Sequence, residues 1–203
     1  MDSVTLRNGV KMPLLGFGVL RMKDPAACIR CVREAYESGY RMFDTAASYG
    51  NEEAVGRALR ELIEEGKAKR EDLFIITKLC IDDAGEEAAG KAFEESCRRL
   101  QTDYIDLYLI HQPYSDYYGA WRTMERLYRE GRVRAVGVSN FSPERLTDLC
   151  LNSRIPPMVN QVELHPFYHQ DGALRVMEEL GVQPQAWAPL CEGLKKIFSN
   201  KVL

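Results

Sequence analysis

Six short, continuously apolar segments recur along the chain, and segments whose apolar residues have helical spacing lie between them. Runs that are apolar throughout, rather than alternately apolar and polar, are typical of strands buried on both faces, as in parallel sheets. The rhythm therefore predicts parallel strands joined by helices. The six predicted strands cover residues 41–46, 73–78, 104–111, 134–140, 158–164 and 182–189.

The segments between the runs carry helix signals. Residues 51–65 begin with Asn51 as the predicted N-cap, and two glutamates follow it at the positive end of the helix dipole. The other predicted helices are 117–131, with Gly131 as its stop, one that begins at Ser142, and one from Asp171 to near Gly181.

Parallel strands joined by helices leave two main architectures, an open doubly wound sheet or a closed barrel. The G-x-G-x-x-G fingerprint of dinucleotide-binding sheets is absent, and the closely spaced Gly16 and Gly18 precede the first predicted strand. We therefore expect a parallel β/α barrel in one domain over residues 1–203. An active site is then expected where the strands end, at the carboxyl-terminal mouth.

Charge and hydropathy exclude several classes of partner. A net charge of −3, with basic and acidic residues interspersed, favours neither nucleic acid nor an anionic membrane. No apolar run approaches the roughly 20 residues of a membrane span, and the first residues lack the apolar core of a signal peptide. We expect a cytoplasmic protein.

Two of the six cysteines, Cys28 and Cys31, form a C-x-x-C motif. Their neighbours alternate at helical spacing, and no second pair of ligands stands nearby to complete a zinc site. The favoured interpretation is a pair of small buried side chains in a reducing compartment. His165 and His169 could form a metal pair, but Pro166 disfavours the helix that such a pair needs, so no metal is expected.

Every predicted strand ends in a side chain able to bind a ligand or do chemistry. One such residue would ordinarily be a cap or a solvated charge. One per strand, all at the same mouth of a barrel, indicates a site. These strand-end residues are Asp44, Lys78, His111, Ser139 with Asn140, Gln161, and Trp187.

Four ionisable residues make chemical sense together. A lysine ammonium, Lys78, would lower the pKa of a neighbouring Tyr49 phenol by stabilising its phenolate. Lys78 itself needs an ionised partner to stay charged inside a barrel, and Asp44 is the candidate. His111 can orient a substrate oxygen. Together these groups would deliver a proton to an oxygen that is becoming an alkoxide.

Five stretches resemble the successive signatures of the aldo-keto reductase family, in its bacterial 2,5-diketo-gluconate reductase-like branch. They are FDTAASYGNEEAVGRAL from residue 43, ITKL from 76, LYLIHQP from 107, VRAVGVSNFSPERL from 133 and VNQVELHP from 159. The resemblance implies a (β/α)8 barrel preceded by a β-hairpin. It also implies reduction of aldehydes or ketones to alcohols by hydride transfer from NADPH, with NADH as the alternative cofactor and no metal.

The resemblance also assigns roles to single residues. Tyr49 would be the general acid, tuned by Lys78 and Asp44, and His111 would position the substrate carbonyl. Leu20 would join His111 at the substrate. The cofactor would contact Gly18, Val19, Asp44, Ser139, Asn140, Gln161, Trp187, Ala188 and Leu190. Hydroxyl and amide side chains suit a carboxamide, and an indole offers a flat face for a nicotinamide ring.

Three positions depart from the family pattern. Val19 and Leu20 stand where the family usually has Thr or a similar residue and then a bulky aromatic, so a different substrate wall is expected. Ala188 stands where the family often has Ser near the pyrophosphate, which removes a hydroxyl donor.

Only about six β/α units were found, whereas a barrel of this type typically has about 250 residues. The sequence therefore predicts a barrel that is incomplete at its C-terminal end. Two hypotheses follow. The chain is an NADPH-dependent carbonyl reductase, monomeric if full length, or it is a catalytically incompetent truncated barrel that associates through its open edge.

Overall fold

The computed structural model describes residues 2–194 and 197–201. An antiparallel hairpin, β1 (Ser3–Thr5) with β2 (Lys11–Pro13), precedes a parallel sheet of seven strands. Each strand of the sheet after the first pairs with the strand before it in the sequence. The strands are β3 (Gly16–Gly18), β4 (Met42–Asp44), β5 (Phe74–Leu79), β6 (Ile105–Ile110), β7 (Val133–Ser139), β8 (Val159–Glu163) and β9 (Gln183–Trp187).

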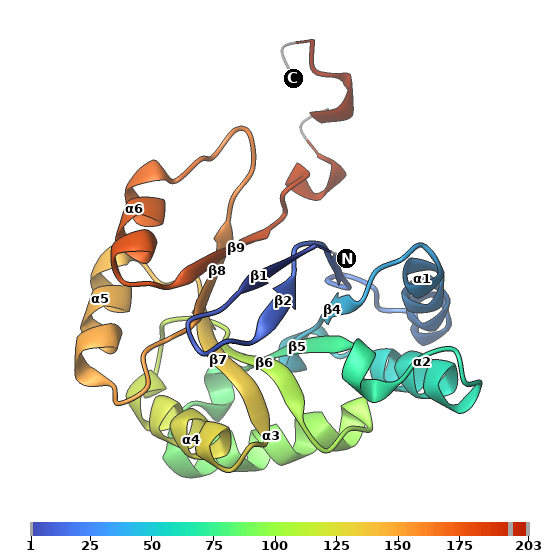
Figure 1. The fold of residues 1–203 in the computed structure, drawn as a ribbon, viewed down its shortest axis with the longest axis horizontal. Helices are drawn as coiled ribbons and strands as arrows, with labels where there is room; N and C mark the ends of the chain where they lie inside the picture. Colours follow the sequence, from blue (N-terminus) through green and yellow to red (C-terminus); the bar gives the residue numbers. More distant parts are fainter. Residues whose placement is uncertain (1, 195–196, 202–203) are drawn as a thin grey trace.

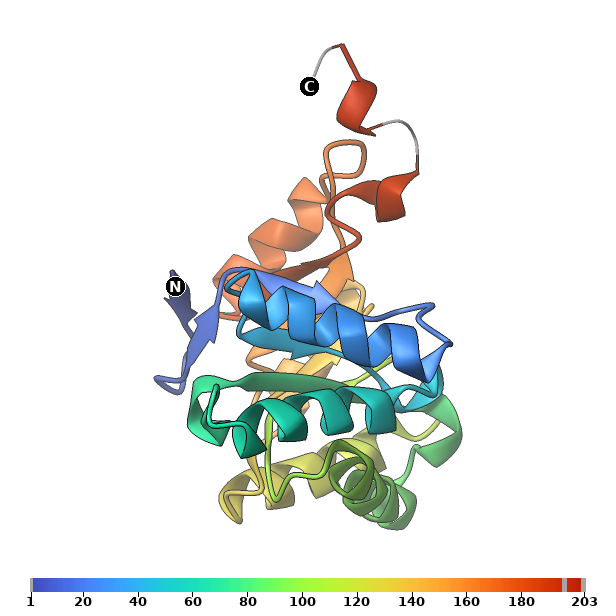
Figure 2. The same ribbon diagram turned by 90° about the vertical axis from the view of Figure 1, so that its right-hand side faces the viewer.

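Six α-helices in the described part of the chain lie outside the curled sheet (Figure 1), and α1 to α4 pack side by side in chain order (Figure 2). A curled parallel sheet with an outer layer of helices confirms the predicted barrel-type α/β fold. The helices are α1 (Pro25–Glu37), α2 (Glu52–Glu64), α3 (Glu86–Leu100), α4 (Tyr117–Arg129), α5 (Pro143–Asn152) and α6 (Asp171–Glu179).

All six predicted strands are present, and a seventh, β3, was missed. It has three residues, two of them glycines, so it shows no continuous apolar run. Phe17 lies opposite Phe43 in parallel register, which makes β3 the first strand of the barrel. The described residues thus contain six complete strand–helix units, β3–α1 to β8–α6, and a further strand, β9.

Burial explains why the strands read as continuously apolar. All six residues of β5 and all six of β6 are buried, because the outer face of each strand packs against helices and the inner face against the barrel interior. The apolar side of α2 faces the core with Val55, Leu59 and Leu62, which are buried, whereas Ile63 is only half-buried.

The hairpin lies at the amino-terminal ends of the strands, opposite the polar strand ends. The side-chain amide of Asn8, between β1 and β2, donates to the Arg134 carbonyl near the start of β7, at 2.9 Å. Arg7 donates to the Leu180 carbonyl, three residues before β9, at 3.4 Å. The hairpin lies in front of the curled sheet in Figure 1 and at one side of the molecule in Figure 2.

The helix starts predicted at Ser142 and Asp171 are confirmed. α5 begins directly after Ser142, and α6 begins at Asp171.

Cys28 is buried within α1 and Cys31 is half-buried, and the six cysteines are unpaired. No helix in residues 2–194 and 197–201 is long and apolar enough to cross a membrane.

Candidate active site

The strand ends meet at one cavity of about 990 Å³. Parallel strands bring their carboxyl ends to the same mouth, and the cavity lies there and extends down the barrel to the hairpin. This volume is at the upper end of the range of roughly 300–1,000 Å³ found for ligand pockets. Predicted site residues on its wall are Gly18, Leu20, Asp44, Tyr49, His111, Ser139, Asn140, Gln161, Trp187 and Ala188.

Lys78 lies behind the wall of the cavity, with its side chain only 1% exposed. Its ammonium donates to Asp44 Oδ1 at 2.5 Å, to the Thr45 carbonyl at 3.0 Å and to the Tyr49 hydroxyl at 3.4 Å. A lysine ammonium has three donors, and all three are used. The buried charge is therefore both paired with a carboxylate and fully hydrogen-bonded, as burial demands.

Tyr49 reaches this ammonium from a turn rather than from a strand. A single 3-10 turn, Ala47–Tyr49, follows β4, and Gly50 ends it with a φ of 69°. This left-handed conformation strains any residue with a Cβ. Two residues of β4 and its extension, Asp44 and Thr45, thus contact the same lysine as a tyrosine a few positions later.

The pKa of Tyr49 is raised from its ordinary value of 10, because burial disfavours the phenolate more than Lys78 favours it. The predicted net lowering is therefore wrong. The contribution of Lys78 has the expected sign, and both its charge and its hydrogen bond lower the pKa, but desolvation outweighs them. The phenol therefore keeps its proton at neutral pH.

Asn51 is the N-cap residue of α2, as predicted, but its side chain makes no cap hydrogen bond. Instead its oxygen accepts from the Thr45 hydroxyl at 2.7 Å, and its amide donates to the carbonyls of Val19 and Met22 at 2.8 and 3.2 Å. The buried amide ties the loop after β3 to the segment that carries Tyr49.

His111 follows β6 and faces Tyr49, with the two ring centroids 5.6 Å apart in an edge-to-face arrangement. Burial, and then the charge of Lys78, lowers the pKa of His111 to about 4. The imidazole is therefore neutral at pH 7. Its Nδ1 lies 3.2 Å from the Ser48 hydroxyl. When that hydroxyl donates, Nε2 carries the proton and can donate to a ligand oxygen.

Ser139, Asn140 and Trp187 form a second hydrogen-bonded group. Asn140 has a left-handed φ of 62°, and its amide donates to the His111 carbonyl at 3.1 Å and to Ser139 Oγ at 3.0 Å. Its oxygen accepts from the indole nitrogen of Trp187 at 2.9 Å. The orientation of the indole is thus fixed by a contact between β7 and β9, two strands apart.

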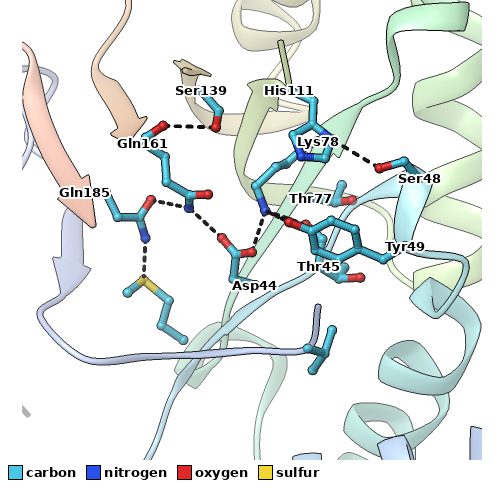
Figure 3. A network of polar contacts seen from close by, with 12 residues as sticks. Asp44, Thr45, Ser48, Tyr49, Thr77, Lys78, His111, Ser139, Gln161 and Gln185 are labelled. Atoms are coloured by element: carbon cyan, nitrogen blue, oxygen red, sulfur yellow. Dashed lines mark hydrogen bonds and ion pairs between the residues drawn. The ribbon is translucent and has the colours of Figure 1, made fainter. Parts of the chain in front are cut away.

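Gln161 joins the two groups across the barrel. Its side-chain amide donates to Asp44 Oδ2 at 2.7 Å, although the two residues lie 117 positions apart and on strands β8 and β4 (Figure 3). The same nitrogen donates to Gln185 Oε1, on β9, at 3.0 Å. None of the described residues donates to Gln161 Oε1.

Two residues that the resemblance assigned to the cofactor do not line the cavity. Val19 is completely buried, and its backbone is used by neighbours, because the amide donates to the Asp44 carbonyl and the carbonyl accepts from Asn51. Leu190 is 54% exposed and lies outside the cavity wall.

The structure adds residues that the sequence did not single out. Ser48, Gln112 and Gln185 line the cavity, and Arg21 forms an ion pair with Glu192 at 2.8 Å from loops that follow β3 and β9. Ser48 stood inside a quoted motif, but its role depends on a contact with His111. Gln185 lies within a predicted strand. Because side chains alternate between the two faces of a strand, Gln185 and Trp187, two residues apart, point to the same face.

The His165–His169 pair is not on a helix. His165 forms an isolated bridge with Tyr168, and its ring contacts Glu163 at 3.1 Å and the backbone amide of Phe167 at 3.1 Å. No group of three or more metal-binding side chains occurs in the part of the chain that the structure describes.

The aldo/keto reductase family model matches residues 14–201. An uncharacterized oxidoreductase, YtbE, of Bacillus subtilis is 48% identical over 93% of this chain and 68% of its own length. A glyoxal reductase of the same organism is 45% identical over the whole of this chain and 71% of its own. A methylglyoxal reductase, DkgA, of Escherichia coli O157:H7 is 39% identical over 98% and 71%.

Solved structures agree with these relatives. An aldo-keto reductase from a deep-sea metagenome library is 42% identical with a TM-score of 0.92, over 98% of this chain and 72% of that one. A Bombyx mori aldo-keto reductase in complex with NADP is 34% identical with a TM-score of 0.89, over 93% and 66%. This chain therefore belongs to the aldo/keto reductase family, a family of NAD(P)H-dependent oxidoreductases.

Proposed function

We propose that the protein reduces the carbonyl group of small aldehydes or ketones to an alcohol with NADPH, and that Tyr49 supplies the proton. The observation that carries this proposal is the buried lysine, whose three donors contact Asp44, Thr45 and Tyr49. Relatives named glyoxal reductase and methylglyoxal reductase support short carbonyl compounds as the substrate class.

Tyr49 acts as the proton donor in this proposal. Its raised pKa keeps the phenol protonated before the reaction. Once the proton leaves, a phenolate remains 3.4 Å from the ammonium of Lys78 and is stabilised by it. Asp44 keeps that ammonium charged, so the pair favours the product of proton transfer more than the starting state.

His111 positions the substrate oxygen. A neutral imidazole whose Nδ1 accepts from Ser48 presents an Nε2 proton. The edge-to-face contact with Tyr49 brings the two rings to one place on the cavity wall. A carbonyl oxygen there would accept from both groups. Leu20, 49% exposed on the same wall, offers an apolar contact to the substrate.

The residues at the mouth fit a nicotinamide. The unpaired Gln161 Oε1 suits the N–H of its carboxamide, and the fixed indole of Trp187 offers a face to the ring. Bound NADPH would supply the hydride. Gly18 and Ala188 border the cavity without a bulky side chain, so a ligand can approach their backbone. Val19 and Leu190 take no part in this proposal, because the backbone of Val19 is paired with its neighbours and Leu190 lies outside the cavity wall.

Tyr49→Phe tests the proposal. We expect turnover to fall at least about a hundredfold, in line with the contribution of general acids, while the Kd for NADPH stays nearly unchanged. Steady-state assays with methylglyoxal as a probe, together with a fluorescence titration of NADPH, separate the two effects. The control is Tyr114→Phe, whose ring is 58% exposed and outside the cavity wall. Normal turnover in Tyr49→Phe would remove the assignment.

A further inference from the structure

Gln185 lies at one end of a continuous line of polar contacts that leads to Tyr49. The line starts at Gln185 on β9, passes through Gln161 on β8 to Asp44 on β4, and continues through Lys78 on β5 to Tyr49 (Figure 3). Gln161 is only 4% exposed. Gln185 is half-buried and lines the cavity.

The chemistry of the partners sets which way the Gln161 amide faces. A side-chain amide has two N–H donors on nitrogen and an acceptor oxygen. Asp44, the ion-pair partner of Lys78, can only accept, so the nitrogen of Gln161 must face it. One N–H goes to Asp44 at 2.7 Å, and the other goes to Gln185 Oε1 at 3.0 Å. Gln161 has no donor left.

Gln185 is held in turn by this contact. The side-chain oxygen of Gln185 faces Gln161, so the amide nitrogen of Gln185 faces away from Gln161. This nitrogen lies 3.9 Å from the sulfur of Met42, a weak acceptor. Met42 lies on the same wall of the cavity, on β4. The orientation of Gln185 therefore follows from the charge of Asp44, through Gln161.

We propose that Gln185 is a positioning residue that makes Gln161 a pure hydrogen-bond acceptor toward the ligand. By taking the second N–H, it leaves only Gln161 Oε1 for the nicotinamide substituent. The site then selects a cofactor whose substituent is a donor, as a carboxamide is, over one that carries a ketone. This inference rests on the proposed use of a nicotinamide cofactor.

The test compares the binding of two ligands. NADP⁺ carries a carboxamide, and its 3-acetylpyridine analogue carries a methyl ketone that accepts but cannot donate. The Kd of each is measured by isothermal titration calorimetry, so no turnover is needed. For the natural sequence we expect the analogue to bind roughly 3- to 10-fold more weakly, the range for one neutral hydrogen bond.

Two variants separate a positioning role from simple packing. Gln185→Met keeps the length of the side chain but removes its acceptor, so the second N–H of Gln161 is released to the ligand. We expect the ratio of the two Kd values to fall to within about twofold of one. Gln185→Glu keeps an acceptor for that N–H and is expected to retain the ratio of the natural sequence.

Three other outcomes would each overturn a different part of the proposal. If the natural sequence does not bind NADP⁺, the proposed function fails, and this inference fails with it. If it binds both nucleotides equally well, the cofactor stands and this inference fails. If Gln185→Met keeps the full ratio, Gln185 does not position Gln161. Thermal unfolding checks that the variants fold, and Gln185→Leu replaces Gln185→Met if the methionine variant does not.

Discussion

Lys78 shows how much of the site depends on single contacts. Its position at the end of a strand was predictable, because the ends of parallel strands meet at one mouth. The direction of the pKa shift of Tyr49 was not predictable, because it depends on whether burial outweighs the lysine charge. Contacts between segments distant in the sequence, such as Gln161 with Gln185, were likewise invisible, since no local pattern reports them.

The lowered pKa of His111 makes the free energy of unfolding depend on pH. The unfolded imidazole titrates near 6.5 and the folded one near 4, so between these values the unfolded state binds more protons. The stabilisation contributed by the neutral ring is present above pH 6.5 and is lost as the pH falls toward 4. We expect the free energy of unfolding to fall over this window, and His111→Gln to make the fall shallower.

Urea unfolding at a series of pH values between 4 and 7 measures this dependence. The control is His169→Gln, because His169 is exposed and its ring contacts the Pro166 carbonyl rather than the surroundings of Lys78. It should reproduce the pH dependence of the natural sequence. Equal slopes for His111→Gln and the natural sequence would contradict the lowered pKa.

Among the elements, α2 packs tightly against the end of α3 at Gly56. A Cβ there would lie 2.5 Å from the Arg99 carbonyl oxygen and 2.6 Å from the Leu100 backbone. Neither atom can move without shifting the end of α3. The glycine is therefore required by packing, although glycine weakens a helix interior.

We expect Gly56→Ala to lower the free energy of unfolding by about 1–3 kcal/mol, the usual range for overpacking. Gly90→Ala on α3 is the matched control, because its Cβ would meet only an ordinary contact, 3.5 Å from the guanidinium of Arg126. That change should be neutral or stabilising by up to about 1 kcal/mol through helix propensity. Chemical denaturation measures the free energy of unfolding of both variants. Equal changes in this free energy for Gly56→Ala and Gly90→Ala would refute the packing argument.

The element that sequence reasoning missed, β3, has a physical explanation. Strands are recognised from apolar and β-branched residues, and a three-residue strand with two glycines has almost none. The helix Glu86–Leu100 was also not singled out. Longer strands such as β5 and β6 were found because both of their faces are buried.

At the scale of the whole molecule, the sheet has two edges, β3 and β9, which do not pair with each other in the described part of the chain. Leu14 and Leu15, directly before β3, are 60% and 63% exposed and line the cavity. Exposed strand edges and apolar side chains favour association with a second chain. The hypothesis of an associating, incompetent barrel stays a prediction.

We expect the 203-residue chain studied by itself to self-associate, with a mass in light scattering that rises with concentration. Leu15→Lys should reduce this association, and Leu151→Lys, a change at a leucine that is 76% exposed on α5, should not. A constant monomer mass would contradict the prediction. Association without any binding of NADPH would favour the incompetent barrel over the reductase.

The strictly sequential strand order has a consequence for how the protein is made. Because each strand pairs with the one synthesised before it, the sheet can grow strand by strand as the chain leaves the ribosome. The contact between Asp44 and Gln161 is different, since 117 residues separate them. At about 5–20 residues per second, synthesis of that interval takes roughly 6–23 s. Lys78 follows Asp44 by only 34 residues, so the aspartate and its lysine can pair while Gln161 is still to be made, and the contact across the barrel forms later.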